Sequence, residues 1–251
     1  MANILFNFKG KHFLVTGASS GMGKTIALQL ADAGAHVLAI ARNEERLHEL
    51  SKVHENIQVC ACDVCDYVAM QESIVEAVTR NGKFDGAVHA AGISFPTPLR
   101  RYDEEKARRM MDVSFWAGAK LVQMLSKKKY TNAGSSFVMF SSCAAHRGAG
   151  GMFAYAAAKA ASKNAVASLA REICKNGSRI NSVSPGCVRT EMVQQEMEAG
   201  LDYTAIEQRH LLGLGKPQDV SSMVLFLLSD EAHWITGTDF IIDGGYMLGD
   251  A

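Results

Sequence analysis

The sequence predicts an α/β protein with a doubly wound, seven-stranded parallel sheet and helices on both faces. Short apolar or β-branched runs alternate with longer stretches in which apolar residues recur every three or four positions, as at Ile26, Leu30 and Ala31. Several short runs are apolar almost throughout, as expected of strands that are covered on both faces. Repeated strand–helix–strand units favour a parallel sheet whose ligands bind at the carboxyl ends of the strands.

Seven strands and six helices follow from this alternation. The strands, chosen for their apolar and β-branched content, are expected at His12–Thr16, His36–Ile40, Ile57–Cys62, Gly86–Ala91, Ser136–Ser141, Arg179–Ser184 and Asp239–Ile242. The helices, chosen for their three- and four-residue period, are expected at Gly23–Ala33, Glu44–Val53, Tyr67–Arg80, Asp103–Lys127, Phe153–Lys175 and Gln218–Leu228.

No linker or repeat divides the chain, so we expect one domain over residues 1–251. The polar stretch at 191–212 interrupts the alternation after a strand end. We interpret it as a mobile lid over the site, with a surface helical insertion as the alternative.

Composition narrows the function classes. The 26 Lys and Arg balance the 26 Asp and Glu, so the formal net charge is zero and gives no reason to expect nucleic acid or an anionic membrane as partner. The start of the chain lacks a basic, apolar leader, and the longest apolar stretch near the end, Met223–Leu228, is far shorter than a membrane span. We therefore expect a cytoplasmic protein.

Cysteine usage agrees with that compartment. Six cysteines in 251 residues are too sparse for a disulfide framework. Cys60, Cys62 and Cys65 suggest a metal site, but a structural zinc site needs four ligands and no second pair follows. We interpret them as packed thiols at a strand end and expect no metal.

A glycine-rich turn follows the first predicted strand. Its sequence is Thr16-Gly-Ala-Ser-Ser-Gly-Met-Gly23, and it opens a predicted helix. Glycines let the backbone turn tightly and approach a diphosphate, which then meets the positive end of the helix. The spacing is Gly-x-x-x-Gly-x-Gly rather than Gly-x-Gly-x-x-Gly, but its context favours dinucleotide binding over a plain strand–helix junction.

Arg42 stands at the end of the second predicted strand. An acidic residue there would bind the adenosine ribose 2′-hydroxyl and repel a 2′-phosphate, whereas an arginine pairs with that phosphate. We therefore favour NADP(H) over NAD(H), with a solvated loop arginine as the alternative.

Tyr155 and Lys159 lie four residues apart in a predicted helix, so they share one face. A nearby ammonium favours the phenolate and lowers the tyrosine pKa, and such a tyrosine can exchange a proton with a carbonyl or alcohol oxygen. Ser142, 13 residues before Tyr155, ends the preceding strand, where its hydroxyl can hold the same oxygen.

With these residues the chain resembles the short-chain dehydrogenase/reductase family over nearly all of its length, with 3-oxoacyl-(acyl-carrier-protein) reductases nearest in pattern. The matching motifs are Thr16–Gly23, Asp63-Val64, Ala91-Gly92, Ser142, Tyr155, Lys159, Asn181-x-x-x-Pro185-Gly186-x-Val188-x-Thr190, Gly213-Leu-Gly-Lys-Pro217 and Asp243-Gly244-Gly245.

The resemblance implies a Rossmann fold that binds NAD(P)(H) and transfers hydride between the nicotinamide and a carbonyl or secondary alcohol. It implies that Ser142 binds the substrate oxygen, Tyr155 is the acid/base and Lys159 bonds the nicotinamide ribose and lowers the Tyr155 pKa. The implied cofactor-binding residues are Gly17, Ser19, Ser20, Gly21, Met22, Gly23, Arg42, Asp63 (for the adenine), Val64, Ala91, Gly92, Tyr155, Lys159, Pro185, Gly186, Val188 and Thr190 (the last two for the carboxamide).

Two positions depart from the family pattern. His89 stands in the family's Asn-Asn-Ala-Gly segment, and we interpret it as a hydrogen-bonded strand-end residue. Ser114 replaces an asparagine that helps to hold a water in the proton relay. A serine can still bond a water, so we count Ser114 among the catalytic residues, although it is shorter than the asparagine.

The expected activity is NADPH-dependent reduction of a ketone, on a small molecule that a carrier protein could hold. Alternatives are a sugar, steroid or polyol oxidoreductase, or a cofactor-binding protein with weakened catalysis. His146 and Met152, between Ser142 and Tyr155, are expected to border the substrate together with Ser142 and Tyr155. The resemblance also implies a homotetramer or homodimer that pairs through Asp103–Lys127 and Phe153–Lys175.

Overall fold

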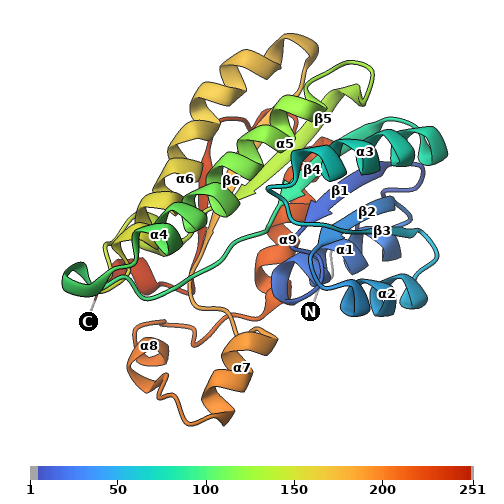
Figure 1. Ribbon diagram of the computed structural model, residues 1–251. Coiled ribbons are helices and arrows are strands. Elements are labelled where there is room, and N and C mark those ends of the chain that lie inside the picture. Colours follow the sequence, from blue (N-terminus) through green and yellow to red (C-terminus); the bar gives the residue numbers. More distant parts are fainter. Residues whose placement is uncertain (1–4, 250–251) are drawn as a thin grey trace.

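The computed structural model describes residues 5–249, and they form the predicted doubly wound sheet (Figure 1). Seven parallel strands lie in the order β3-β2-β1-β4-β5-β6-β7. They are β1 His12–Thr16, β2 His36–Ala41, β3 Ile57–Ala61, β4 Phe84–His89, β5 Thr131–Phe140, β6 Arg179–Pro185 and β7 Asp239–Ile242. The chain runs from β1 outward to β3 and then returns to β4. The β1–β4 pair is therefore the switch point, where a crevice opens at the carboxyl ends of the strands.

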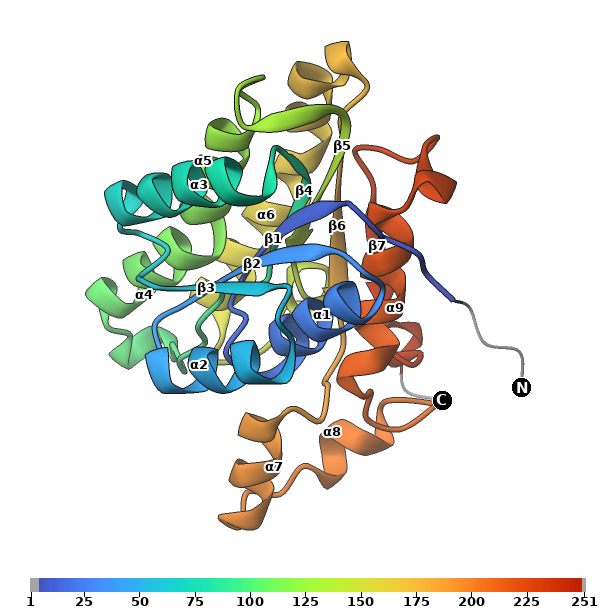
Figure 2. The same cartoon turned by 90° about the vertical axis from the view of Figure 1, so that its right-hand side faces the viewer.

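Helices cover both faces of this sheet (Figure 2). They are α1 Gly21–Asp32, α2 Glu44–Val53, α3 Tyr67–Asn81, α4 Glu104–Met111, α5 Ala117–Leu125, α6 Phe153–Ile173, α7 Glu191–Glu198, α8 Thr204–Gln208 and α9 Pro217–Leu228. Val15 and Val37 pack in a core with α1, α2 and α9, whereas Leu14 and Leu38 pack in a second core with α3, α5 and α6. This alternation explains why the strands read as continuous apolar runs. Among residues 5–249, no helix is long and apolar enough to span a membrane.

The predicted helix over Asp103–Lys127 is wrong as a single α-helix. It is divided into α4 and α5 by a π turn at Asp112–Trp116. The wider turn frees backbone groups, and the Ser162 hydroxyl of α6 donates to the Ser114 carbonyl oxygen at 3.0 Å. π turns inside helices are frequent at functional sites, and Ser114 lies in the middle of this one.

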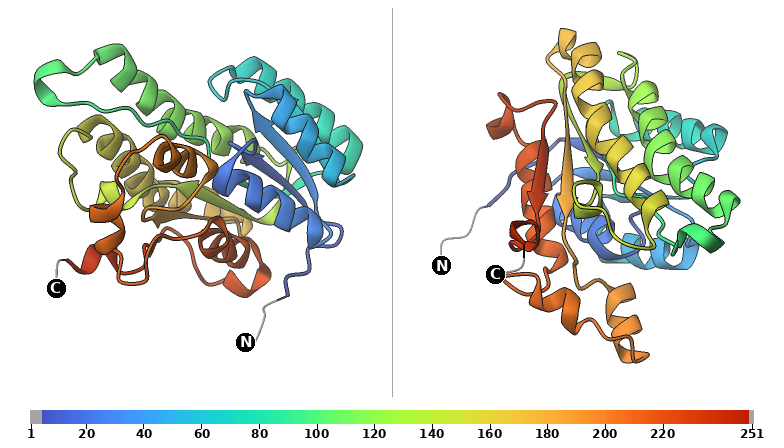
Figure 3. Two further views of the ribbon diagram at one scale, coloured as in Figure 1. Left: turned by 90° about the horizontal axis from the view of Figure 1, so that it is seen from below. Right: turned by 90° about the vertical axis from the view of Figure 1, so that its left-hand side faces the viewer.

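Residues 191–212 form α7 and α8, which project beyond the end of β6 (Figures 1 and 3). The first residue of α7, Glu191, forms ion pairs with Lys24 of α1 at 3.7 Å and Arg46 of α2 at 3.6 Å. These contacts place the start of the segment directly beside the glycine-rich turn.

Candidate active site

A cleft of about 340 Å³ lies at the switch point and gathers segments that are far apart in the sequence. Its lining includes most of the predicted cofactor-binding residues: Gly17, Ser19, Ser20, Gly21, Met22, Gly23, Arg42, Asp63, Val64, Ala91, Gly92 and Thr190. Pro185, Gly186, Val188, Tyr155 and Lys159 lie outside this lining. A larger hollow of about 1330 Å³, between residues 5–8, α9 and β7, contains none of the predicted site residues.

The glycine-rich turn leaves the start of α1 open to an anion. Gly17 has a φ of +69°, and a Cβ there would lie 2.8 Å from the Ala91 nitrogen, so the position requires glycine. The Ser20 side chain makes no capping hydrogen bond, and the first turn of α1 carries no acidic residue. By contrast, Asn43 and Asp66 cap α2 and α3 with their side chains. The first N–H groups of α1 are thus available to a diphosphate, which fits a dinucleotide.

At the other end of the cleft, two arginines surround Asp63. Arg109 forms an ion pair with Asp63 Oδ2, and the Cys65 N–H donates to Asp63 Oδ1 at 2.8 Å. Burial opposes ionisation of Asp63, but the Cys65 N–H and the charges of Arg109 and Arg42 together lower its pKa. Arg109 was missed by the sequence analysis, because nothing in the pattern of α4 shows that one of its arginines reaches a loop 46 residues earlier.

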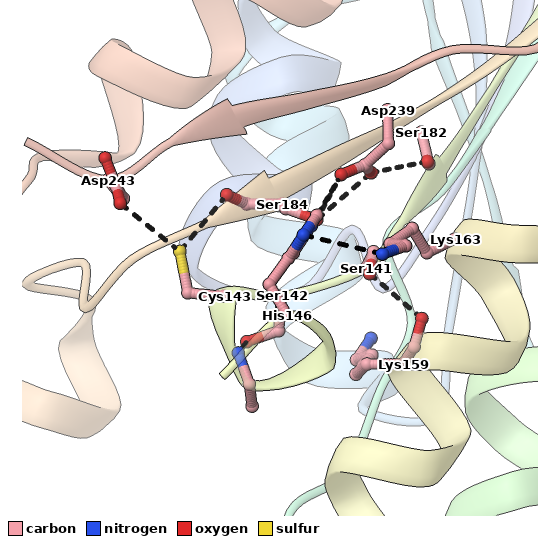
Figure 4. A network of polar contacts seen from close by, with 11 residues as sticks. Ser141, Ser142, Cys143, His146, Lys159, Lys163, Ser182, Ser184, Asp239 and Asp243 are labelled. Carbon is pink, nitrogen blue, oxygen red and sulfur yellow. Dashed lines mark hydrogen bonds and ion pairs between the residues drawn. The ribbon is translucent and has the colours of Figure 1, made fainter. Parts of the chain in front are cut away.

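Ser142, Tyr155 and Lys159 come together where β5 ends and α6 begins. Ser142 follows β5, and its Oγ accepts a hydrogen bond from the Ala144 N–H at 3.2 Å. Tyr155 and Lys159 lie one turn apart on α6, with Lys159 Nζ 5.8 Å from the centre of the Tyr155 ring. Lys159 is buried and donates to the Phe140 carbonyl oxygen at 3.0 Å (Figure 4 shows Ser142 and Lys159). The predicted sharing of one face of α6 by Tyr155 and Lys159 is therefore present. Ser142 follows the end of β5, where the sequence also placed it.

The prediction that the Tyr155 pKa is lowered is wrong for the protein without cofactor. Burial raises the pKa of Tyr155, although a hydrogen bond with Ser142 acts in the opposite direction. Burial also lowers the pKa of Lys159 to about 8. Both shifts have the same cause, because removal from water disfavours phenolate and ammonium alike. The ammonium is directed at the Phe140 carbonyl, so it does not offset the desolvation of the phenol.

His89 has the structural role that the sequence predicted. Its Nε2 lies 2.9 Å from the Val113 carbonyl oxygen and its Nδ1 lies 2.9 Å from Thr16 Oγ1. Burial lowers the His89 pKa to about 4, so the ring is neutral at physiological pH and donates through Nε2. His89 therefore joins the end of β1 to the π turn that carries Ser114.

Ser114 is fully buried, and its Oγ finds no hydrogen-bond partner among residues 5–249. It lies near Lys159: a Cβ placed on Gly92 would be 3.1 Å from Lys159 Nζ and 3.7 Å from Ser114 Oγ. A buried hydroxyl without a partner is uncommon, and an ordered water or another polar group can satisfy it. Its place beside Gly92 fits a hydroxyl-bearing group that enters from the cofactor cleft.

The loop between Ser142 and Tyr155 places its two predicted substrate residues differently. His146 uses both ring nitrogens inside the protein, on Asp239 and Lys163, so it offers neither to a substrate. Met152 precedes α6 and pairs with Thr97 through a backbone bridge. Substrate contact by both residues stays a prediction.

The cysteines remain free thiols. Cys60, Cys62 and Cys65 are half-buried and pack against the core beneath α3. Within residues 5–249, no group of three or more His, Cys, Asp or Glu side chains is arranged to hold a metal ion.

A family model described as "Enoyl-(Acyl carrier protein) reductase" matches residues 17–247. The chain is 32% identical to a 3-oxoacyl-(acyl-carrier-protein) reductase, FabG, of Rickettsia conorii, over 97% of this chain and all of the relative. A short-chain type dehydrogenase/reductase of Mycobacterium ulcerans superposes with a TM-score of 0.90 at 30% identity, over 97% of this chain and 92% of that one. The chain belongs to the short-chain dehydrogenase/reductase family.

Family membership makes the chain an oxidoreductase that works with a nicotinamide cofactor. Its relatives differ in substrate. A 7alpha-hydroxysteroid dehydrogenase of Escherichia coli K12 is 28% identical, over 94% of each chain. The cleft at the β1–β4 switch point is where a dinucleotide binds in such a sheet.

Proposed function

We propose that the chain is an NADPH-dependent reductase that converts a ketone, of the 3-oxoacyl type or a similar small carbonyl compound, into a secondary alcohol. The grouping of Ser142, Tyr155 and Lys159 beside the cleft carries the proposal. The 3-oxoacyl class is supported by the similarity to the Rickettsia conorii reductase, and the same similarity supports a carrier protein as the holder of such a substrate.

When bound, NADPH supplies the hydride to the carbonyl carbon. Ser142 and Tyr155 bind the carbonyl oxygen through their hydroxyl groups, and Tyr155 transfers its proton as negative charge develops on that oxygen. The raised pKa of Tyr155 keeps it protonated at neutral pH, as a proton donor must be before reduction. The start of α1 holds the diphosphate, Asp63 the adenine, Lys159 the nicotinamide ribose, and Val188 and Thr190 the carboxamide.

The first alternative is a sugar, steroid or polyol dehydrogenase, and the similarity to the hydroxysteroid dehydrogenase favours it. The second alternative is a cofactor-binding protein with weakened catalysis, and the replacement of the family's asparagine by Ser114 favours it. Absorbance at 340 nm, followed with NADPH and an acetoacetyl thioester, a ketosteroid, a ketose and a simple ketone, distinguishes them. We expect the thioester to be reduced with the highest kcat/KM. Preference for the steroid or the ketose would support the first alternative, and binding of NADPH without turnover would support the second.

Arg42 is expected to set the cofactor preference. It lines the cleft close enough to Asp63 to affect its pKa, and it is exposed to an arriving 2′-phosphate. A charge-assisted hydrogen bond of this kind contributes roughly 1.5–3 kcal/mol, or about one to two decades of affinity. Titration by fluorescence should therefore show NADPH binding about 10–100-fold more tightly than NADH. Arg42→Ala should narrow that ratio, and Arg80→Ala on α3 should not. Equal binding of the two cofactors by the unaltered chain would refute the assignment.

Ser114 is expected to serve catalysis rather than stability. Because its buried Oγ has no partner among residues 5–249, Ser114→Ala should leave the free energy of unfolding unchanged or raise it by about 1 kcal/mol. If the hydroxyl holds the relay water, the same variant should lower kcat and make it depend on buffer concentration. Ser114→Asn should preserve or raise kcat at an unchanged NADPH Kd. A stable Ser114→Ala variant with wild-type kcat at every buffer strength would make Ser114 a packing residue.

We also infer that residues 191–212 act as a lid and that the chain forms a homotetramer or homodimer. The ion pairs of Glu191 with α1 and α2 support the first inference, because they lie at the edge of the cofactor cleft. The exposed Trp116, in the π turn before α5, and the exposed Phe153, the first residue of α6, support the second, because they lie in the two segments through which the family resemblance implies pairing.

A further inference from the structure

A partly buried polar network joins the turn after Ser142 to three other elements (Figure 4). At its centre, His146 Nε2 lies 2.8 Å from Asp239 Oδ2 of β7 and 3.2 Å from Ser184 Oγ of β6. His146 Nδ1 lies 3.5 Å from Lys163 Nζ of α6, the helix that carries Tyr155. The His146 side chain therefore contacts strands β6 and β7 and helix α6, which carries Tyr155.

The partners determine the protonation of the ring. An ionised Asp239 only accepts hydrogen bonds, so His146 Nε2 carries a hydrogen and donates it. The Lys163 ammonium only donates, so His146 Nδ1 accepts. A neutral imidazole protonated on Nε2 satisfies both neighbours. Asp239 also accepts from Ser182 Oγ at 2.5 Å and from Ser184 Oγ at 2.9 and 3.0 Å, so its charge is well compensated.

A second side chain fixes the other end of the same turn. The buried thiol of Cys143 donates to the Ser184 carbonyl oxygen at 3.6 Å and lies 3.8 Å from Asp243 Oδ2. Burial raises the Cys143 pKa to about 12, so the thiol keeps the hydrogen that it donates. The short helical turn at Cys143–Ala145 is thus held at both ends by Ser184, through Cys143 and through His146.

The direction of the Ser142 hydroxyl depends on this turn. Ser142 Oγ accepts from the Ala144 N–H at 3.2 Å, and interaction with the same hydroxyl counteracts the rise in the Tyr155 pKa that burial causes. We propose that His146 is a positioning residue for reduction. It links the turn at Cys143–Ala145 to α6 through Lys163, and to β6 and β7 through Ser184 and Asp239. These links keep the Ser142 hydroxyl correctly placed relative to the Tyr155 hydroxyl. The proposal rests on the roles of Ser142 and Tyr155 given above, and the hydrogen bonds of the His146 ring go to Asp239, Ser184 and Lys163.

The test compares His146→Leu, which keeps bulk but no hydrogen bonds, with His146→Gln, which keeps a donor for Asp239. With acetoacetyl-coenzyme A and NADPH, His146→Leu should lower kcat by about 10–100-fold, since small misplacements of reacting groups have effects of this size. The NADPH Kd should stay within about twofold of wild type, because the cofactor cleft lies outside the network. His146→Gln should recover most of kcat, and the exposed-site control His233→Leu should match wild type.

A thermodynamic cycle separates positioning from general support. If His146 acts through Ser142, adding His146→Leu to Ser142→Ala should lower kcat no further. Full additivity of the two effects, a wild-type kcat in His146→Leu, or an equal loss in His146→Gln would each overturn the proposal. Should His146→Leu fail to fold, Lys163→Met removes only the α6 contact, and a wild-type kcat there would also overturn it.

A readout without turnover keeps this test independent of the proposed reaction. The ¹³Cζ resonance of labelled Tyr155, assigned by its loss in Tyr155→Phe, reports the Ser142 hydrogen bond. Ser142→Ala and His146→Leu should shift it in the same direction, and His146→Gln should leave it in place. A resonance unmoved in His146→Leu but moved in Ser142→Ala would refute the positioning role, whatever substrate the chain reduces.

Discussion

Tyr155→Phe is expected to lower kcat by about 10²–10⁴-fold, the usual contribution of a positioned proton donor. The variant keeps the ring, which lies over the Lys159 side chain at 5.8 Å, and loses only the hydroxyl. Ser142 would still bind the carbonyl oxygen, but no group in its place could neutralise the developing alkoxide. Steady-state rates at 340 nm and fluorescence titration of NADPH should show a large change in kcat and a change of less than about twofold in Kd.

Tyr130→Phe is a matched control, because it removes a buried phenol near the start of β5, away from the cleft. It should leave both kcat and the NADPH Kd near wild type. A Tyr155→Phe variant that retains wild-type kcat would remove the proton-transfer step from the proposed function. Loss of NADPH binding in the same variant would instead show that Tyr155 acts mainly in cofactor binding.

The sheet and the cleft could be predicted because their signals are local. Apolar runs mark strands covered on both faces, and the glycine-rich turn marks the switch point. The close approach of Gly17 to Ala91 was not predicted, because it joins distant segments, although a glycine allows two backbones to come this near. The grouping of Ser142, Tyr155 and Lys159 could also be predicted from the sequence. A strand end places Ser142, and the four-residue spacing places Tyr155 and Lys159 on one face of a helix.

The parts that could not be predicted depend on contacts between distant segments. The π turn at Ser114 is stabilised by Ser162 and by His89 acting on the Val113 carbonyl, and neither contact leaves a periodic trace in the sequence. Arg109 reaches Asp63 from another helix. The pKa of Tyr155 was predicted with the wrong sign, because spacing shows a neighbouring cation but does not show how deeply the pair is buried.

Gly23→Ala is expected to destabilise the chain and abolish tight NADPH binding. Helix propensity alone predicts the opposite, because alanine is favoured over glycine by about 1 kcal/mol within a helix. A Cβ at Gly23, however, would lie 2.8 Å from the Gly17 carbonyl carbon and would overlap the Gly17 oxygen, and both are backbone atoms that cannot rotate away. Relieving this overlap requires α1 to move from the turn, and overpacking of this kind costs about 1–3 kcal/mol.

The steric cost of the new Cβ is therefore expected to exceed the gain in helix propensity. The steric cost lowers Tm, whereas the gain in helix propensity raises it. For a domain of this size, the net loss of up to about 2 kcal/mol should lower Tm by up to about 8 °C. The NADPH Kd should rise more than about tenfold, because the N–H groups at the start of α1 would no longer converge on one diphosphate. Gly148→Ala is the control: a Cβ there meets nothing within 4 Å, so Tm and Kd should stay at their wild-type values. A Gly23→Ala variant with a raised Tm and an unchanged NADPH Kd would show that the glycine-rich turn can shift to accommodate the Cβ. It would also show that dinucleotide binding does not depend on the close approach of α1 to Gly17.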